Sequence, residues 1–253
     1  MSGRLKGRLA LVTGASRGLG AAIAKAYAAE GAHVIGVART TGALEELDDQ
    51  IKGLGGTATL VPMDLADFDA IDDLGRQIFE RWGKLDILVG NAAILGDLSP
   101  VGHIRPEVWQ RAYDLNVTAN YRLIRSMDSL LRRSDAGRAL FITSGAARGL
   151  LPYWALYAST KAALDAIALI YAKETMKTSV RVNVVNPGPT RTEMRSAAFP
   201  GEDPSQLPAP DHIAETMIAL AEPGFTETGL WIAADAQTTA TQLANSGDKE
   251  SIH

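Results

Sequence analysis

Three side chains that can exchange a proton with a substrate lie close together in the stretch SGAARGLLPYWALYASTK, residues 144–161. Tyr157 and Lys161 are four residues apart, within an apolar-periodic segment that runs to about Lys173, so both side chains are expected on one face of a helix. An ammonium beside a phenol favours the phenolate, which lowers the tyrosine pKa toward the working pH. This spacing predicts that Tyr157 is a general acid or base.

Ser144 adds an alcohol thirteen residues before the tyrosine, at the end of the apolar run ALFITS. In a parallel sheet the carboxyl ends of the strands are where ligands bind. The Ser144 hydroxyl can therefore hydrogen-bond the same substrate oxygen and stabilise the charge that develops on it. The alternative is that the three residues share a region by chance, and the glycine-rich turn described below argues against it.

Short β-branched or aliphatic runs alternate along the chain with segments whose apolar residues recur every three to four positions, such as Ile71, Leu74 and Ile78. The runs cover residues 9–14, 33–39, 58–64, 85–92, 139–144, 180–187 and 229–234. Such alternation is typical of a parallel sheet between helix layers, because each parallel connection needs a crossover. We predict an α/β fold: a doubly wound, Rossmann-like parallel sheet of about seven strands with helices on both faces.

One continuous sheet would make residues 1–253 a single domain, and two stretches break its pattern. Residues 188–210 are rich in proline and follow a strand, so we expect a long loop with one helical turn that acts as a substrate lid. Residues 235–253 form a polar tail without an apolar face. We expect this tail to be loose or docked on a partner subunit.

The sequence TGASRGLG, residues 13–20, follows the first predicted strand and opens the first predicted helix. Gly14 permits a tight turn, while Gly18 and Gly20 allow a ligand to approach the backbone closely. The amides at the start of a helix can bind a pyrophosphate. The position of this turn therefore predicts a dinucleotide site; a plain tight turn is the alternative.

The second predicted strand ends in VART, with Arg39 where NAD-binding folds normally carry an acid for the adenosine 2′-hydroxyl. The missing carboxylate removes repulsion toward a 2′-phosphate. Arg39 and Arg17 can both donate charge-assisted hydrogen bonds to that phosphate. The sequence thus favours NADP(H) over NAD(H), the alternative being that both arginines are merely solvated.

Composition excludes several classes of function. The chain has 253 residues, a net charge of -4 and no basic excess, so we expect no nucleic-acid partner. The absence of cysteine and of paired histidines makes a metal site improbable. No apolar run approaches the roughly 18 residues of a membrane span, and the start of the chain lacks a secretory core. We therefore expect a cytoplasmic protein without a membrane partner.

These motifs together resemble those of the short-chain dehydrogenases/reductases, over roughly residues 5–234. The family's TGxxxGxG matches residues 13–20, and its YxxxK matches Tyr157 and Lys161. Its catalytic serine falls on Ser144 and its helix asparagine on Asn116 in DLNVTAN. The resemblance implies a catalytic tetrad of Asn116, Ser144, Tyr157 and Lys161, in which the lysine also binds the nicotinamide ribose and the asparagine supports a water relay.

The resemblance extends to the cofactor. Asp64 and Leu65 match the position that meets the adenine ring, and NPGPTRT matches the turn that contacts the nicotinamide carboxamide and begins the lid. The residues expected to bind the cofactor are Gly14, Ser16, Arg17, Gly18, Leu19, Gly20, Arg39, Asp64, Leu65, Asn91, Ala92, Tyr157, Lys161, Pro187, Gly188, Thr190 and Thr192. The chain departs from the family at Ala93, which replaces a glycine, and in its last strand, which reads IAADAQ.

The resulting prediction is an NADP(H)-dependent oxidoreductase that acts on a ketone or a secondary alcohol. The predicted pocket walls are mostly apolar: Ile94, Leu95, Leu150, Leu151, Tyr153, Trp154, Met194 and Phe199. They favour a hydrophobic or aromatic carbonyl compound, although Arg148 or Arg195 could bind an acidic group. A 3-oxoacyl-thioester reductase and a non-catalytic NADP(H)-sensing protein remain as alternatives. The helices around 107–132 and 160–177 are expected to form a homo-dimer or homo-tetramer, as is common in the family.

Overall fold

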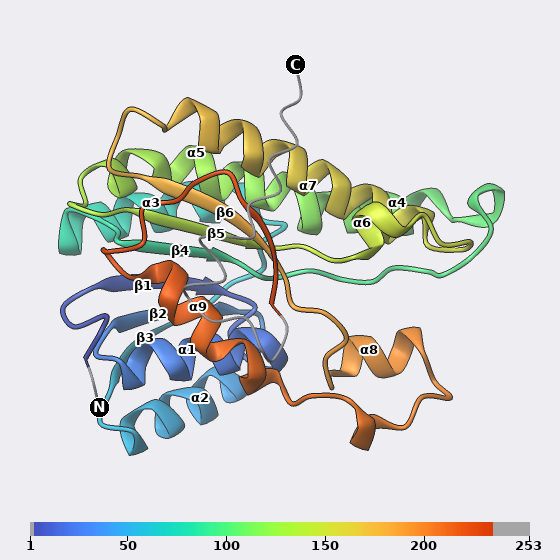
Figure 1. The fold of residues 1–253 in the computed structure, drawn as a ribbon, viewed down its shortest axis with the longest axis horizontal. Coiled ribbons are helices and arrows are strands. Elements are labelled where there is room, and N and C mark those ends of the chain that lie inside the picture. The colour runs from blue at the N-terminus through green and yellow to red at the C-terminus, as the bar shows by residue number, and fades with distance from the viewer. Residues whose placement is uncertain (1–2, 235–253) are drawn as a thin grey trace.

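The computed structural model describes residues 3–234, and its centre is one sheet of seven parallel strands in the order β3-β2-β1-β4-β5-β6-β7 (Figure 1). The strands are β1 (Leu9–Thr13), β2 (His33–Ala38), β3 (Thr57–Pro62), β4 (Ile87–Gly90), β5 (Arg138–Ile142), β6 (Arg181–Asn186) and β7 (Trp231–Ala233). The sheet order reverses direction between β1 and β4. The carboxyl edge beside this reversal is where such sheets bind ligands.

The helices are α1 (Gly18–Ala29), α2 (Thr41–Gly53), α3 (Phe68–Trp82), α4 (Pro106–Tyr113), α5 (Ala119–Arg132), α6 (Ala146–Gly149), α7 (Ala155–Glu174), α8 (Glu193–Ala198) and α9 (Ala214–Ala221). A π-helix, Asp114–Thr118, joins α4 to α5. Short 3-10 helices occupy Val101–His103, Pro204–Gln206 and Pro210–Ile213. Within residues 3–234, no helix is both long and apolar enough to cross a membrane.

Two helix layers cover the sheet (Figure 1). Helices α1, α2 and α9 bury Ile23, Leu47 and Met217 against one face. Helices α3, α5 and α7 bury Leu74 and Leu164, among others, against the opposite face. Because the central strands are apolar on both faces, the sheet is stable only between two such layers.

The predicted fold class is confirmed. Each of the seven predicted runs overlaps one strand, with ends displaced by at most two residues. The expected lid, residues 188–210, contains α8 and a 3-10 helix, so it is more helical than the single turn predicted. Thr192 caps α8, since its hydroxyl accepts a hydrogen bond from Arg195 N at 3.2 Å. The predicted tail, 235–253, lies outside the described residues.

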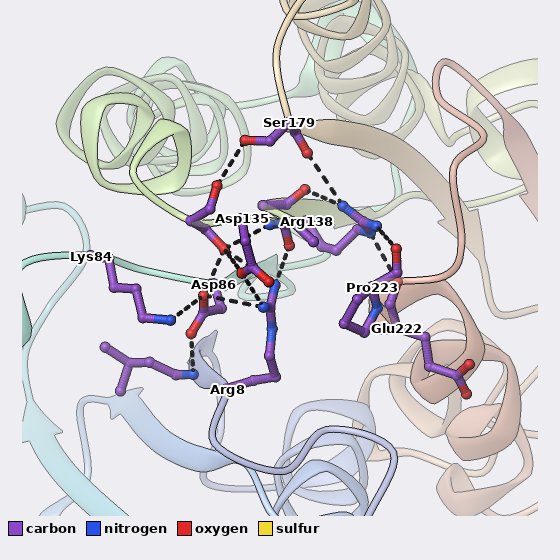
Figure 2. A network of polar contacts seen from close by, with 12 residues as sticks. Arg8, Lys84, Asp86, Asp135, Arg138, Ser179, Glu222 and Pro223 are labelled. Atoms are coloured by element: carbon purple, nitrogen blue, oxygen red, sulfur yellow. Dashed lines mark hydrogen bonds and ion pairs between the residues drawn. The ribbon is translucent and has the colours of Figure 1, made fainter.

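A buried polar network ties the strands together at their amino ends, the edge opposite the ligand-binding edge (Figure 2). Asp86, which precedes β4 and is fully buried, accepts hydrogen bonds from Leu9 N at 2.9 Å and the Ser134 hydroxyl at 2.6 Å. Lys84 Nζ lies 3.0 Å from the same carboxylate and Arg8 Nη1 lies 3.6 Å from it. These partners compensate the cost of burying the charge.

Arg138, the first residue of β5, extends this network to α9 (Figure 2). Its guanidinium donates to Glu222 O at 3.1 Å and to Pro223 O at 2.8 Å, just past the end of α9. Burial, reinforced by the charges of Arg8 and Arg181, lowers the pKa of Arg138 to about 10, so the side chain stays charged at neutral pH. A cation at this position satisfies carbonyls that a helix end leaves unpaired.

Replacing Asp86 with Ala should lower the free energy of unfolding by about 3 kcal/mol, because Leu9 N and the Ser134 hydroxyl lose their buried acceptor and Arg8 loses one of its two neighbouring carboxylates. Chemical denaturation measures this value. The control is Asp73→Ala, which removes a carboxylate from an exposed i,i+3 pair with Arg76 and should have a much smaller effect. Equal losses in the two variants would contradict a stabilising role for the network.

Candidate active site

A cavity of about 680 Å3 opens at the carboxyl edge of the sheet. It is lined by the glycine-rich turn, by residues that follow β2, β3, β4, β5 and β6, and by the start of α7 and the segment around α8. All the predicted cofactor residues line this cavity except Gly20. Ser144 also lines it, and Asn116 does not.

The glycine-rich turn has the conformation that its sequence indicated. Gly14 and Gly18 have φ values of 65° and 55°, in the left-handed region that favours glycine. A Cβ atom on Gly20 would lie 2.1 Å from Gly14 O, so this glycine closes the turn from within instead of lining the cavity. The turn therefore requires all three glycines, although only two of them face the cavity.

Asn91 joins this turn to the end of β4. Its Nδ2 donates to Thr13 O at 2.8 Å, while the Thr13 hydroxyl accepts from Asn91 N at 3.0 Å and from Ala92 N at 3.1 Å. The side chain predicted to bind the cofactor is thus partly used to hold the loop. Ala93, where the family has glycine, lines the cavity directly after this junction.

Asp64, the residue expected to meet the adenine ring, lines the cavity and has a partner that the sequence did not indicate. Arg111 on α4 donates to Asp64 Oδ2 at 2.8 Å, and Ala66 N donates to Oδ1 at 3.0 Å. Burial opposes ionisation of Asp64, but these two donors and the charge of Arg39 outweigh it and lower the pKa of the carboxyl. A sequence separation of 47 residues gave no signal for the pair.

The two arginines expected to bind a 2′-phosphate have different surroundings. Arg17 forms an exposed ion pair with Glu193, the first residue of α8, so it links the glycine-rich turn to the lid. Arg39 is exposed after β2 and lines the cavity, and within residues 3–234 it has no ion pair. Arg39 is the better placed of the two to receive an anionic ligand.

Helix α7 places Tyr157 and Lys161 beside the end of β5. Lys161 is buried, and its Nζ donates to Ile142 O, the last carbonyl of that strand, at 2.8 Å. The same nitrogen lies 5.7 Å from the centre of the Tyr157 ring. Ser144, two residues beyond the strand, faces the Tyr157 phenol closely enough to lower its pKa. The alcohol, the phenol and the amine therefore meet at one edge of the sheet.

The predicted direction of the Tyr157 pKa shift is wrong for this structure. Burial raises the pKa of Tyr157 to about 12 and outweighs the effect of the Ser144 hydroxyl. Burial also lowers the pKa of Lys161 to about 8, against the charge of Asp165, which raises it. The expectation failed because the Lys161 ammonium is bound to the strand carbonyl and lies over the phenol ring instead of contacting its oxygen.

Asn116, the fourth predicted member of the tetrad, lies in the π-helix and is fully buried. Its side chain donates to Ile94 O at 2.9 Å and to the Thr160 hydroxyl at 3.0 Å, and accepts from Ile94 N at 2.9 Å. The asparagine thus joins the loop after β4 to the residue before Lys161. Its direct contacts hold this loop against α7, outside the cavity.

Aromatic side chains form one wall of the cavity and join it to the lid. The Trp154 ring lies 5.5 Å from Phe199 and 6.1 Å from Tyr157, measured between centroids. The Arg195 guanidinium lies 3.7 Å from the Phe199 centroid and also pairs with Glu202 at 2.6 Å, so its charge is already balanced. The cavity wall near Tyr157 is consequently apolar and aromatic.

Three residues that sequence analysis placed near the substrate lie elsewhere. Leu150 and Tyr153 are exposed and do not line the cavity; both lie in the turn between α6 and α7, with positive φ values of 45° and 72°. Arg148 instead stacks on Trp231, with its guanidinium 4.2 Å from the ring centroid. Apolar character alone did not distinguish Leu151, which lines the cavity although it is half exposed, from these neighbours.

His212 lies beside the turn that follows β6 and contacts two backbone carbonyls there. Its ring nitrogens lie 2.9 Å from Pro187 O and 2.7 Å from Ala209 O. These contacts connect both ends of the lid segment. A lone histidine in a proline-rich loop carries no sequence signal for such a role.

Known proteins resemble this chain in both sequence and fold. The sequence pattern of the family described as short chain dehydrogenase matches residues 8–203. The chain belongs to the short chain dehydrogenase family. The uncharacterized oxidoreductase YciK of Escherichia coli (strain K12) is 35% identical over 212 residues, which cover 83% of this chain and 84% of YciK.

Two further similar proteins have a cofactor or a substrate stated in their descriptions. A solved short chain dehydrogenase from Shigella flexneri 2a str. 301, complexed with NADP, has a TM-score of 0.89 and 34% identity, covering 92% of this chain and 99% of that one. The 3-oxoacyl-[acyl-carrier-protein] reductase of Synechocystis sp. (strain ATCC 27184 / PCC 6803 / Kazusa) is 35% identical over 191 residues, which cover 75% of this chain and 77% of the reductase.

Proposed function

We propose that this short chain dehydrogenase is an NADP(H)-dependent oxidoreductase that interconverts a ketone and a secondary alcohol. The observation that carries the proposal is the meeting of Ser144, Tyr157 and Lys161 in the cavity that the glycine-rich turn also lines. A phenol and an alcohol aimed at one space can share a substrate oxygen. The adjoining turn would hold the second reactant beside them.

The residues present fit a nicotinamide dinucleotide. The left-handed Gly14 and Gly18 leave backbone exposed to the cavity at the start of α1, where a pyrophosphate would bind. Asp64 lines the same cavity and would face the adenine ring, as the family resemblance implies. Arg39, without an acid partner among residues 3–234, would bind a 2′-phosphate. The NADP-bound relative from Shigella flexneri supports the choice of NADP(H).

Tyr157 is suited to donate a proton in the reductive direction. Because burial raises its pKa to about 12, the phenol is protonated at neutral pH and can give its proton to a carbonyl oxygen. The Ser144 hydroxyl would stabilise the charge that develops on this oxygen. Lys161, whose pKa is about 8, would supply positive charge next to the phenol as it becomes a phenolate. The bound nicotinamide supplies the hydride.

The aromatic and apolar wall favours a carbonyl compound of matching character. Trp154 and Phe199 form a continuous surface next to Tyr157, and Leu151 and Met194 line the same cavity. Arg195 is paired with Glu202, so its charge is already balanced beside this wall. We therefore expect an apolar or aromatic ketone of moderate size.

A 3-oxoacyl-thioester reductase is the second candidate. It is favoured by the Synechocystis relative, whose named activity is the reduction of a 3-oxoacyl group.

Self-association also stays a prediction, supported by the apolar side chains that α5 and α7 expose, among them Tyr121 and Ile170. Neither question changes the assignment of the proton donor.

Replacing Tyr157 with Phe keeps the ring and its packing against Trp154 but removes the proton. NADPH affinity should remain within a few-fold, while NADPH oxidation with an aromatic ketone should fall to roughly a hundredth or less. Tyr153→Phe is the matched control, because Tyr153 is exposed and outside the cavity. Turnover above a hundredth in Tyr157→Phe would show that the proton comes from another group.

Replacing Arg39 with Asp should shift the ratio of kcat/KM values from NADPH toward NADH by at least tenfold, because a carboxylate repels a 2′-phosphate and can accept from a 2′-hydroxyl. Steady-state kinetics with both cofactors measures the ratio. Lys177→Asp makes the same charge change between α7 and β6, at the edge where β6 begins. An unchanged ratio in Arg39→Asp, or an equal shift in Lys177→Asp, would refute the assignment.

A further inference from the structure

A buried carboxylate, that of Asp165, lies next to the proposed catalytic residues and has no part in the proposed proton transfer. Asp165 is on α7, one helical turn beyond Lys161, and is 8% exposed. Its Oδ2 accepts a hydrogen bond from Trp231 Nε1 at 3.0 Å. Its Oδ1 is buried and has no hydrogen-bond partner within residues 3–234. A half-satisfied buried carboxylate is costly, so its retention calls for a physical reason.

The surroundings of Asp165 come from three elements that meet behind the site. Trp231 is the first residue of β7, and Arg148 on α6 covers the face of its ring. Thr143, between β5 and Ser144, lies near the carboxylate and lowers its pKa, although no hydrogen bond of ordinary geometry joins the two side chains. Asp165 is therefore fixed by contacts to the sheet and is not a mobile surface acid.

Two cations compensate the Asp165 carboxylate: Arg148 on α6 and Lys161 on the same helix as Asp165. Residues four apart on a helix lie on the same face, separated by about 6 Å along its axis. The Lys161 ammonium is buried, and the hydrogen bond it makes among residues 3–234 goes to a neutral carbonyl, Ile142 O. An isolated ammonium in such a place tends to lose its proton. A fixed anion one turn away opposes that loss through space.

We propose that Asp165 is a positioning residue of this active site: held by Trp231, its carboxylate keeps the buried ammonium of Lys161 charged beside Tyr157. The importance of this charge for turnover rests on the proposed function. The electrostatic interaction between Asp165 and Lys161 does not rest on the proposed function, because it is a property of the protein without any ligand.

The electrostatics of the pair agree with this role. Burial lowers the pKa of Lys161 to about 8, and Asp165 is the group whose charge raises it again. Burial raises the pKa of Asp165, while Thr143, the Trp231 indole and the charges of Arg148 and Lys161 lower it. Arg148 on α6 and Tyr157 on α7 are the other charged or titratable groups that face the pair.

The test is a direct titration of Lys161 by NMR in protein labelled with 13C at lysine Cε, the resonance being identified by its absence in Lys161→Arg. In the wild type the midpoint should lie near pH 8. In Asp165→Asn, which keeps the size of the side chain and an acceptor for Trp231, the midpoint should fall by about one unit, because loss of the anion destabilises the ammonium. An unchanged or higher midpoint would overturn the proposal.

Asp128→Asn is the matched control. Asp128 on α5 also accepts a hydrogen bond from an aromatic side chain, the Tyr171 hydroxyl of α7, at 2.7 Å. Tyr171 lies ten residues, about 15 Å along the helix, beyond Lys161, so this variant should leave the Lys161 midpoint unchanged. An equal fall in both variants would indicate a general loosening of α7 and would overturn the specific role of Asp165.

A second measurement needs no variant and covers the case in which Asp165→Asn does not fold. Asp165 must be ionised around pH 8 to act on Lys161, so its 13Cγ resonance in the wild type should show a carboxylate there. A protonated Asp165 at this pH would overturn the proposal.

Kinetics then separates this proposal from the proposed function. If Lys161 must be charged for turnover, the alkaline limb of kcat/KM in Asp165→Asn should move to lower pH by the same amount as the NMR midpoint. A merely structural role would lower the rate equally at every pH, which would count against the proposal. A wild type inactive on every carbonyl compound would refute the proposed function and leave the NMR result to decide on Asp165.

Discussion

The Lys161 ammonium, buried and bonded to the last carbonyl of β5, is the contact on which the rest of the site depends. It fixes the start of α7 against the edge of the sheet, and this places Tyr157 next to Ser144. Burial lowers the pKa of this ammonium, and the charge of Asp165 opposes that effect. The position of the Tyr157 phenol and the buried charges on α7 therefore belong to one arrangement.

The two edges of the sheet differ in how their polar groups are arranged. At the amino edge, Asp86 and Arg138 each form hydrogen bonds with neighbouring segments. These bonds hold the starts of the strands and the end of α9 together (Figure 2). At the carboxyl edge the polar groups of the Gly14 turn and of Ser144 line a cavity. A rigid edge on one side lets the opposite edge carry side chains that must be placed precisely but not packed.

Sequence analysis could predict the features that depend on local pattern. The alternation of strand and helix patterns predicted the parallel sheet. The motif spacing predicted that Ser144, Tyr157 and Lys161 lie together, and all three line one cavity. It could not predict features that depend on burial or on contacts distant in the chain. The pairing of Arg111 with Asp64 is one example, and the raised pKa of Tyr157 is another, because it depends on how deeply the phenol lies and where the ammonium points.

The most direct test of the account is NADPH and NADH oxidation measured against a panel of aromatic ketones, aliphatic ketones and 3-oxoacyl thioesters. The account predicts turnover that is faster with NADPH than with NADH and fastest with an apolar or aromatic ketone. Tight binding of NADPH without turnover of any compound would contradict it, and would indicate a protein that senses the nucleotide without using it.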